Sequence, residues 1–401
     1  MTALSDDDPL VRPDPKAVDR ILHRIASKEF DPKRDIEPEL FAHTFGALNK
    51  AVDKGFGRVE YGTEDAAFVE QIRYNNAVFA AAKTFNQQND LTREMFDEKG
   101  RVRSFGQFRK EAEPIIGAYN VDWLQTEYST TIIRSQHAQK WREMERDADL
   151  YPNLEWMPST SAHPREAHRT FYGLILPMNH PFWSSNYPGN LWGCKCGIRS
   201  TAAEPTDRKG IQSAAKGAPK GDPGLDENPG ATGAIFSRSH PYFAEAQVGY
   251  KALRPIVEEY ANKAMRRYTL AQVKAVKETI DPYRGLRVYG TNLHAGSATF
   301  LRRTFRDVKS HNPDFRVLAH LADPAKAVRN WEYIGRKEVG VYPEGHKLAG
   351  QRKHPDAEYF CYYKVEIDGQ TKYVHTKVSR QHEGEVPYVI TENLDMTGIK
   401  K

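Results

Sequence analysis

The chain has 401 residues, of which 39% are hydrophobic and 28% are charged, and its net charge is +5. This length predicts two or three domains, and three cysteines are too few for the disulfide framework of a small secreted protein. No apolar run approaches the ~20 residues of a membrane-spanning helix, so we expect no membrane partner.

The first part of the chain is predicted to be mainly helical. Its start is acidic and Pro-rich, without the basic and apolar segments of a signal peptide, so we expect a protein that stays in the cytoplasm. Apolar residues then recur at helical spacing in five segments, which are 15–30, 37–57, 64–91, 104–120 and 121–149. The Pro-bounded segment 152–164 predicts a strand and a turn.

Residues 163–199 hold an unusual concentration of side chains that can do chemistry. Cys194 and Cys196 lie here with Trp183, Trp192 and three histidines, which are His163, His168 and His180. Thiolates and imidazoles are ligands that zinc prefers, so the candidate metal ligands are His168, Cys194 and Cys196. The C-x-C spacing is tighter than in most structural zinc sites. We therefore expect no cofactor, and the cysteines are then small buried residues in an aromatic cluster; a structural zinc ion is the alternative.

The second part of the chain is predicted to be α+β. Residues 204–240 are rich in Gly and Pro and predict a linker. Helical patterns at 243–280 precede a strand at 284–292, a basic helix at 296–311, and strands at 314–322, 331–343, 358–379 and 386–393. Asp368-Gly369, between two alternating apolar runs, predicts a hairpin turn. The fold class is therefore α+β multidomain, with a helical N-terminal half, a small Cys/His/Trp-containing module, and C-terminal helices with an antiparallel sheet.

Charge is distributed unevenly between these parts. From residue 246 onward the chain has 27 Lys and Arg against 18 Asp and Glu, a net charge of +9, whereas the remainder carries −4. A basic part suits an anionic partner such as nucleic acid. The other interpretation is a solvated basic surface.

The motifs of the central segment identify a family resemblance. Arg165-x-x-His168, Pro181-Phe182-Trp183 and Trp192-Gly193-Cys194-Lys195-Cys196 follow one another in the order seen in phage Mu F-like minor head proteins. That family is related to the head morphogenesis protein of phage SPP1. The resemblance covers roughly residues 37–233, and Lys195 departs from it, because the family more often has arginine there.

This resemblance implies a head protein of a phage or prophage, located in the virion head or the host cytoplasm. Its partners would be portal and capsid proteins, and the role of His168, Cys194 and Cys196 would be structural. The implied domains are an N-terminal arm at 1–36, a Mu F-like head morphogenesis domain at 37–203, the linker at 204–240, a helical connector at 241–280, and an α+β domain at 281–401.

The C-terminal domain is similar, in element order and basic charge, to the barnase/EndoU/colicin/RelE-like ribonuclease fold. A metal-independent ribonuclease needs a base, an acid and cations for the phosphorane. Strand alternation places Tyr373, His375 and Lys377 on one face. The candidate catalytic residues are therefore His375 and Lys377, with Arg352 and His354 from the preceding loop and Thr391 from the last strand; Arg336 and Lys337 are lesser candidates.

A different class of function is open for the same domain. It is a non-catalytic module that binds nucleic acid or the portal, with Arg and Lys of 264–274 and 302–309 on phosphates. Aromatic residues of the strand at 358–379 would then be stacking platforms for bases, although their alternation also suits a core; they are Tyr359, Phe360, Tyr362 and Tyr363.

Overall fold

The protein, studied as a computed structural model, divides into two compact units. One is formed by Met1–Arg58 with Phe68–Met265, and the other by Val59–Ala67 with Arg266–Lys401. The residues that the structure describes are 13–57, 59, 64–207, 209–211, 220–244, 250–280, 285–301, 303–304, 307–308, 317, 320–321, 323–367, 370–379 and 381–401. In this part of the chain, no helix is both long and apolar enough to cross a membrane.

Long helices build the first unit, as the apolar spacing predicts. They are α1 (Pro15–Ile25), α2 (Pro38–Phe56), α3 (Glu64–Arg93), α4 (Phe105–Gly117) and α5 (Trp123–Arg146). Side-chain caps fix where α1 and α4 begin: Asp14 accepts the Lys16 N–H, and Ser104 forms a reciprocal capping box with Gln107. A π-helical turn at Ala118–Asp122 joins α4 to α5, so these two predicted helices are continuous.

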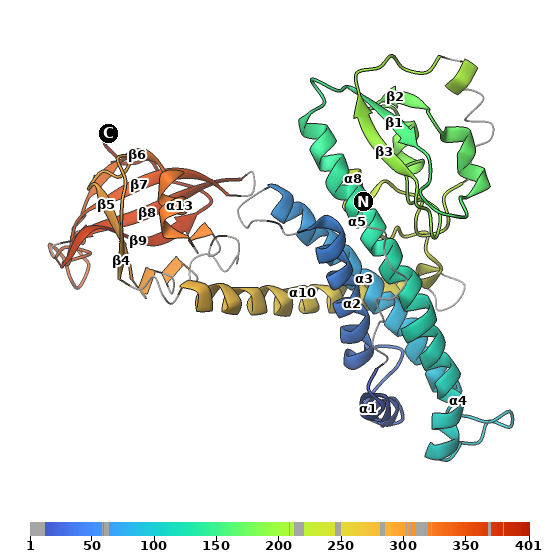
Figure 1. The fold of residues 1–401 in the computed structure, drawn as a ribbon. Coiled ribbons are helices and arrows are strands. Elements are labelled where there is room, and N and C mark those ends of the chain that lie inside the picture. Colours follow the sequence, from blue (N-terminus) through green and yellow to red (C-terminus); the bar gives the residue numbers. More distant parts are fainter. Residues whose placement is uncertain are drawn as a thin grey trace. The chain divides into compact units, whose positions relative to one another are not determined.

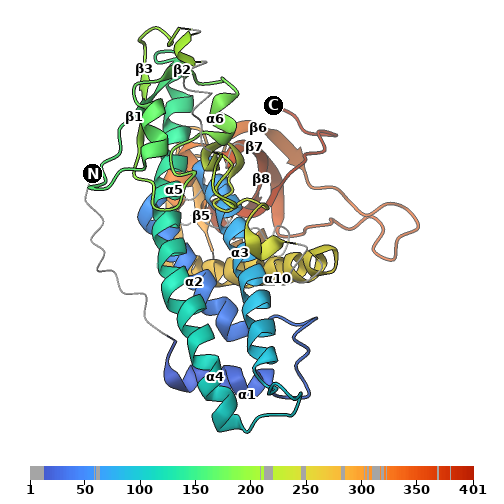
Figure 2. The ribbon, with the colours of Figure 1, turned by 90° about the vertical axis from the view of Figure 1, so that its right-hand side faces the viewer.

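The interior between α2, α3 and α5 buries charged groups as well as apolar ones. Figure 2 shows the three helices running side by side. Lys83 of α3 and Glu127 of α5 are almost completely buried and form an ion pair, and Tyr242 donates its hydroxyl to the same carboxylate at 3.0 Å. Burial raises the pKa of Glu127 and lowers the pKa of Lys83. Removal of one partner would leave an uncompensated charge inside the bundle.

A small three-stranded sheet lies beside the C-terminal part of α5 (Figure 1). Its order is β2-β1-β3 and both pairs are antiparallel; the strands are β1 (Asn153–Met157), β2 (Ile175–Pro177) and β3 (Gly197–Thr201). A 3₁₀ helix (Glu166–Phe171) precedes β2, and α6 (Phe182–Ser185) follows it. Trp156, Phe171 and Trp183 fill the core of this module together with both cysteines. It is the small Cys/His/Trp module that the sequence predicts.

The predicted linker is wrong for its second half. Residues 220–244 pack into the first unit, with α8 (Pro229–Thr232) and a 3₁₀ helix (Pro241–Phe243). The buried Arg134 guanidinium of α5 donates to the carbonyls of Gly189, Leu225 and Glu227, at 2.9, 3.1 and 2.7 Å. These hydrogen bonds and the burial of Phe236 fix a segment whose Gly and Pro content alone indicates a flexible chain.

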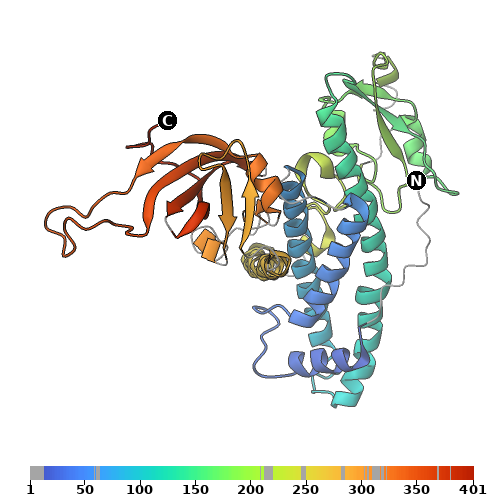
Figure 3. The ribbon, with the colours of Figure 1, turned by 60° about the vertical axis from the view of Figure 1, so that its left-hand side comes forward.

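The second unit contains a six-stranded sheet of order β4-β5-β9-β8-β7-β6. Its strands are β4 (Leu286–Tyr289), β5 (Ser297–Phe300), β6 (Glu332–Glu338), β7 (Ala357–Ile367), β8 (Gln370–Ser379) and β9 (His382–Thr391). Figure 3 shows the sheet curving, with the loop between β6 and β7 extending away from it. Asp368-Gly369 lies outside the described residues, but Ile367 pairs with Gln370 on either side of it, as a hairpin requires.

Several predictions for this unit need correction. The β5–β9 pair is parallel rather than antiparallel. Residues 297–300 form β5, although we expected the start of a helix there; helical residues follow at 303–304 and 307–308. Val317 and His320 are helical in the predicted strand 314–322, because an apolar run this short fits either structure. The unit boundary falls inside α10 (Tyr250–Ile280), ahead of the predicted boundary at 281.

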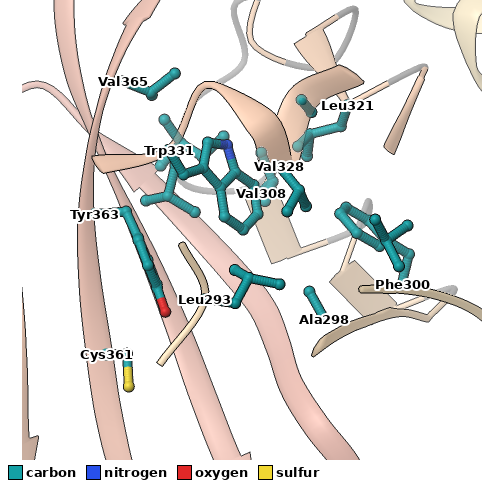
Figure 4. Close-up of a cluster of buried hydrophobic side chains, with 14 of the residues drawn as sticks. Leu293, Ala298, Phe300, Val308, Leu321, Val328, Trp331, Cys361, Tyr363 and Val365 are labelled. Carbon is teal, nitrogen blue, oxygen red and sulfur yellow. The ribbon is translucent and has the colours of Figure 1, made fainter. Parts of the chain in front are cut away.

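One face of this sheet carries the larger core. Figure 4 shows Cys361, Tyr363 and Val365 of β7 on the same side as Trp331 and Phe300. The helix α13 (Pro324–Arg329) adds buried side chains to this cluster. A smaller cluster, which includes Phe360 and Tyr362, lies on the other face, as strand alternation requires.

Candidate metal centre and candidate sheet-face site

The structure brings together the three residues predicted as metal ligands. His168 lies on the 3₁₀ helix before β2, and Cys194 and Cys196 lie in the turn that leads into β3. The His168 Nδ1 atom is 3.3 Å from Cys194 Sγ and 3.6 Å from Cys196 Sγ. The three ligand atoms lie within 4.8 Å of one another, and the three side chains are at most 3% exposed. Their long separation in sequence is therefore no obstacle to a shared site.

Local turns position the two thiols. Gly193 has φ +72°, a conformation that glycine adopts without strain, and Cys194 N–H donates to the Leu191 carbonyl at 3.1 Å. Trp192 N–H donates to the Asp222 carboxylate at 2.7 Å, and Arg165 donates to the Trp192 carbonyl. The segment around Asp222 thus helps to fix the cysteine turn.

The pKa values of the two thiols are shifted in opposite directions. A hydrogen bond from Cys196 together with the nearby His168 lowers the pKa of Cys194 well below its usual range, whereas the bond to Cys194 and burial raise the pKa of Cys196. One thiolate beside an imidazole is the kind of donor set that zinc prefers, and binding of the ion would release the proton of the second thiol. The residues therefore fit a zinc ion in their chemistry.

The surroundings of the cluster favour a structural role. The edge of the Trp156 ring meets His168 with ring centroids 5.2 Å apart, and Phe171 closes another side. His168 Nε2 is buried without a hydrogen-bond partner, whereas zinc-bound imidazoles usually donate from their second nitrogen. A substrate has no access to side chains this deeply buried, so the cluster is suited to holding the module together.

The other two histidines of the segment lie outside this cluster. His163 is exposed, and His180 accepts the Phe182 N–H on its Nδ1 at 3.2 Å, at the start of α6. The H-x4-H spacing is thus no ligand pair. Among the residues that the structure describes, His168, Cys194 and Cys196 form the one group of three or more such side chains with metal-ligand geometry.

The candidate catalytic residues of the second unit lie on the face of the smaller cluster. Along β8, residues 373, 375 and 377 are half-buried while residues 374, 376 and 378 are buried, so the predicted alternation is confirmed. His375 Nε2 lies 2.9 Å from the hydroxyl of Thr391 on β9, which pairs these two candidates directly. Lys377 forms an ion pair with Asp356, and this cation lowers the pKa of Asp356.

His354, in the loop before β7, reaches the same face through its ring contact with Phe360, but no contact among the described residues places the Arg352 side chain there. Arg352 donates to the carbonyl of Ala357, the first residue of β7, at 2.8 Å, so part of its guanidinium ties the loop to the start of the strand. The rings that connect His354 to His375 are those of Phe360 and Tyr388, with successive centroid distances of 5.2, 5.8 and 6.2 Å. Aromatic rings therefore lie between the two histidines. The lesser candidates Arg336 and Lys337 lie on β6.

Sequence reasoning missed two carboxylates that organise this unit. Asp356 is the partner of Lys377, and its position directly before a strand gave no signal of that contact. Glu385 is fully buried and accepts hydrogen bonds from Tyr363, Thr376 and the Ala295 N–H. Strand alternation could have placed Glu385 on the inner face of β9, but not its three donors.

The comparisons with known proteins concern a limited part of the chain. It is 27% identical over 129 residues to "Putative capsid assembly protein F" of Escherichia phage Mu, covering 31% of this chain and 29% of that protein. It is 25% identical over 89 residues to "Mu-like prophage FluMu F protein" of Haemophilus influenzae, covering 22% of each. The chain thus spans less than a third of either relative. No family model and no solved structure matches. The two relatives support the resemblance to Mu F-like proteins.

Proposed function

We propose that the chain is a minor head protein of a phage or prophage that acts near the portal during head assembly. The observation that carries this proposal is the 129-residue similarity to a protein named for capsid assembly. The buried Cys/His/Trp module fits this role, because its side chains are placed for packing and not for access by a substrate. Portal and capsid proteins are the partners that the role implies.

Protein quantification in purified heads tests the proposal. Heads made by the phage that carries this chain should contain it at few copies, far fewer than the major capsid protein. Deletion of the gene should lower the yield of DNA-filled heads. Heads that form and fill normally, with the chain absent from them, would contradict the proposal.

We propose in addition that the second unit is a ribonuclease-like effector. The support is the half-buried face of β8, where His375 pairs with Thr391 and Lys377 lies on the same face. In such a reaction the 2′-oxygen of RNA attacks phosphorus, the bond to the 5′-oxygen breaks, and a proton moves from the 2′-hydroxyl to the leaving oxygen. His375 would carry that proton, and cations would stabilise the phosphorane.

RNA cleavage by the full chain in the presence of a chelator tests this second proposal. The expected result is cleavage that His375→Ala lowers at least a hundredfold, the usual contribution of a general acid or base. A folded chain that leaves RNA intact would reject the effector. The second unit would then be the alternative, a non-catalytic module that binds nucleic acid or the portal.

We also propose a structural zinc ion on His168, Cys194 and Cys196. The support is the donor chemistry of these three buried side chains and the low pKa of Cys194. The ion would supply no chemistry to a substrate. It would tie the 3₁₀ helix before β2 to the turn before β3, and so replace core that a small module lacks.

A further inference from the structure

A second group of polar and aromatic side chains lies in the second unit, around an exposed histidine. His294, in the loop after β4, stacks on Tyr333 of β6 with ring centroids 5.0 Å apart and planes 10° apart. Tyr359 of β7 meets the His294 ring at its edge, at 5.7 Å. The guanidinium carbon of Arg336 lies 5.2 Å from the centroid of the Tyr359 ring. We call these four residues the His294 face.

The His294 face is on the opposite side of the sheet from His375. Tyr333 and Tyr359 pack against the larger core cluster, which contains Cys361 and Tyr363. The His375 ring contacts Tyr362, which belongs to the smaller cluster. The two histidines therefore belong to separate surfaces, and a variant of one face can serve to test the other.

A buried hydrogen-bond network holds the His294 loop in place. Glu385 Oε1 accepts from Ala295 N–H at 2.8 Å and from the Tyr363 hydroxyl at 2.6 Å, and the same hydroxyl accepts the His294 N–H at 2.9 Å. Asn292 donates its amide to the carbonyls of Val328 and Trp331, both at 2.7 Å. The loop backbone is thus fixed before any ligand arrives, which lowers the entropy cost of binding.

The exposed groups of the His294 face remain accessible. His294 and Arg336 are exposed, while Tyr333 and Tyr359 are half-buried with their rings against the core. Arg336 has a carboxylate neighbour in Glu338, but their closest atoms are 3.9 Å apart and both side chains are well exposed, at 45% and 68%. An ion pair of this kind is worth little and leaves the guanidinium available to an anion.

We propose that the His294 face binds single-stranded nucleic acid, with a base against its rings and a backbone phosphate on Arg336. This inference rests on the proposed function of the second unit only in taking nucleic acid as the partner. Stacking on exposed aromatic rings suits unpaired bases of any sequence, and a planar guanidinium matches a phosphate in charge and geometry. The net charge of +9 from residue 246 onward favours the same polyanion. Paired bases in a duplex are not available for stacking.

Fluorescence anisotropy with the full chain tests the inference. The probes are a labelled 2′-O-methyl RNA oligonucleotide, a DNA oligonucleotide of the same sequence, and a duplex of that DNA. Because 2′-O-methyl RNA lacks the attacking hydroxyl, the result does not depend on whether the chain cleaves RNA. The variants are Arg336→Gln and His294→Ala, and the matched control is Lys364→Gln, which removes a cation of equal exposure, 45%, from β7. Circular dichroism confirms that each variant is folded.

The expected result is that Arg336→Gln weakens binding of a single strand about tenfold and lowers the salt slope by about 0.7, the value for one phosphate contact. His294→Ala should weaken binding about fivefold through lost stacking, and Lys364→Gln by less than about twofold. Tighter binding of the RNA or of the DNA strand identifies which of the two is preferred. Failure of the wild type to bind either strand, equal binding of the duplex, or an Arg336→Gln variant that binds like wild type would overturn the inference.

Discussion

His168 and His375, the histidines of the two candidate sites, differ in what surrounds them. His168 faces two thiols in a core where all three side chains are at most 3% exposed. His375 shares a half-buried sheet face with Thr391 and Lys377. The same residue type is thus fully buried in the first unit and only half-buried in the second. A histidine in a cluster is a candidate for chemistry only where a substrate can reach it, and burial makes that distinction here.

The largest expected effect comes from replacing His168 in the buried candidate metal centre. His168→Asn should lower the free energy of unfolding of the first unit by more than about 3 kcal/mol, because the buried ligand set would lose the proposed zinc ion. The matched control is His163→Asn, an exposed histidine of the same segment, which should change stability by less than about 0.5 kcal/mol. Urea unfolding followed by tryptophan fluorescence measures both. Equal midpoints for the two variants would contradict any contribution of His168 to the stability of the first unit, through a metal or through packing.

Arg134→Met tests whether residues 220–235 belong to the first unit. The variant removes the donor to three carbonyls and should cost about 3 kcal/mol, because those carbonyls stay buried without a partner. Lys140→Met on the same helix is the control. Limited proteolysis should cut the segment after Glu227 faster in the Arg134 variant. Unchanged cleavage would mean that the segment is held by its apolar contacts alone.

The pH dependence of the first unit should contain a contribution from His240. Burial lowers the pKa of His240 to about 3, and its Nδ1 accepts the Tyr242 N–H. In the unfolded chain His240 is protonated near pH 6.5, whereas in the folded chain it stays neutral at that pH. Stability therefore falls as the pH falls. Between about pH 7.5 and about pH 5 this one group should account for about 2 kcal/mol. His240→Asn keeps a side-chain acceptor for the Tyr242 N–H and should remove the contribution of His240 to the pH dependence of stability. An unchanged pH dependence would mean that other groups cause it.

The smallest effect is expected on the open face. The Lys377 and Asp356 side chains are 15% and 32% exposed, so a double-mutant cycle with Lys377→Met and Asp356→Asn should give a coupling free energy of about 0.5 kcal/mol. Thermal unfolding of the four proteins measures it. A coupling free energy of several kcal/mol would mean that this ion pair stabilises the fold as strongly as a buried pair such as Lys83 and Glu127. The half-buried face of β8 would then not differ from the buried interior of the first unit in this respect.

Periodicity was enough to predict most elements. The helices of the first unit and the β7–β8 pair follow from apolar spacing, since their patterns extend over many residues. For shorter elements the apolar pattern did not distinguish a helix from a strand. The apolar residues of 297–300 suit a helix or a strand equally, and pairing with β9, distant in sequence, makes them a strand. The same limit explains the wrong strand at 314–322.

The sequence predicted which residue types form the candidate sites, but not which residues contact one another in them. The sequence identifies His168, Cys194 and Cys196 as a possible ligand set by chemistry, and folding of the 3₁₀ helix against the cysteine turn supplies the missing proximity. It could not reveal that Arg134 fixes a Gly/Pro-rich segment, because that contact joins residues 91 positions apart. For the His294 face the sequence analysis named Tyr359 and Arg336 separately, but it did not reveal their grouping with His294 and Tyr333, because the four residues come from one loop and two strands.

Metal content of the full chain is the most direct test of the contrast between a sealed structural site and an open one. The protein is purified without added metal or chelator and analysed by mass spectrometry for bound metals. We expect about one zinc ion per chain, which Cys194→Ser and Cys196→Ser together abolish and which His375→Ala leaves in place. A folded wild-type chain without zinc would contradict the structural metal centre and leave the Cys/His/Trp module to packing alone.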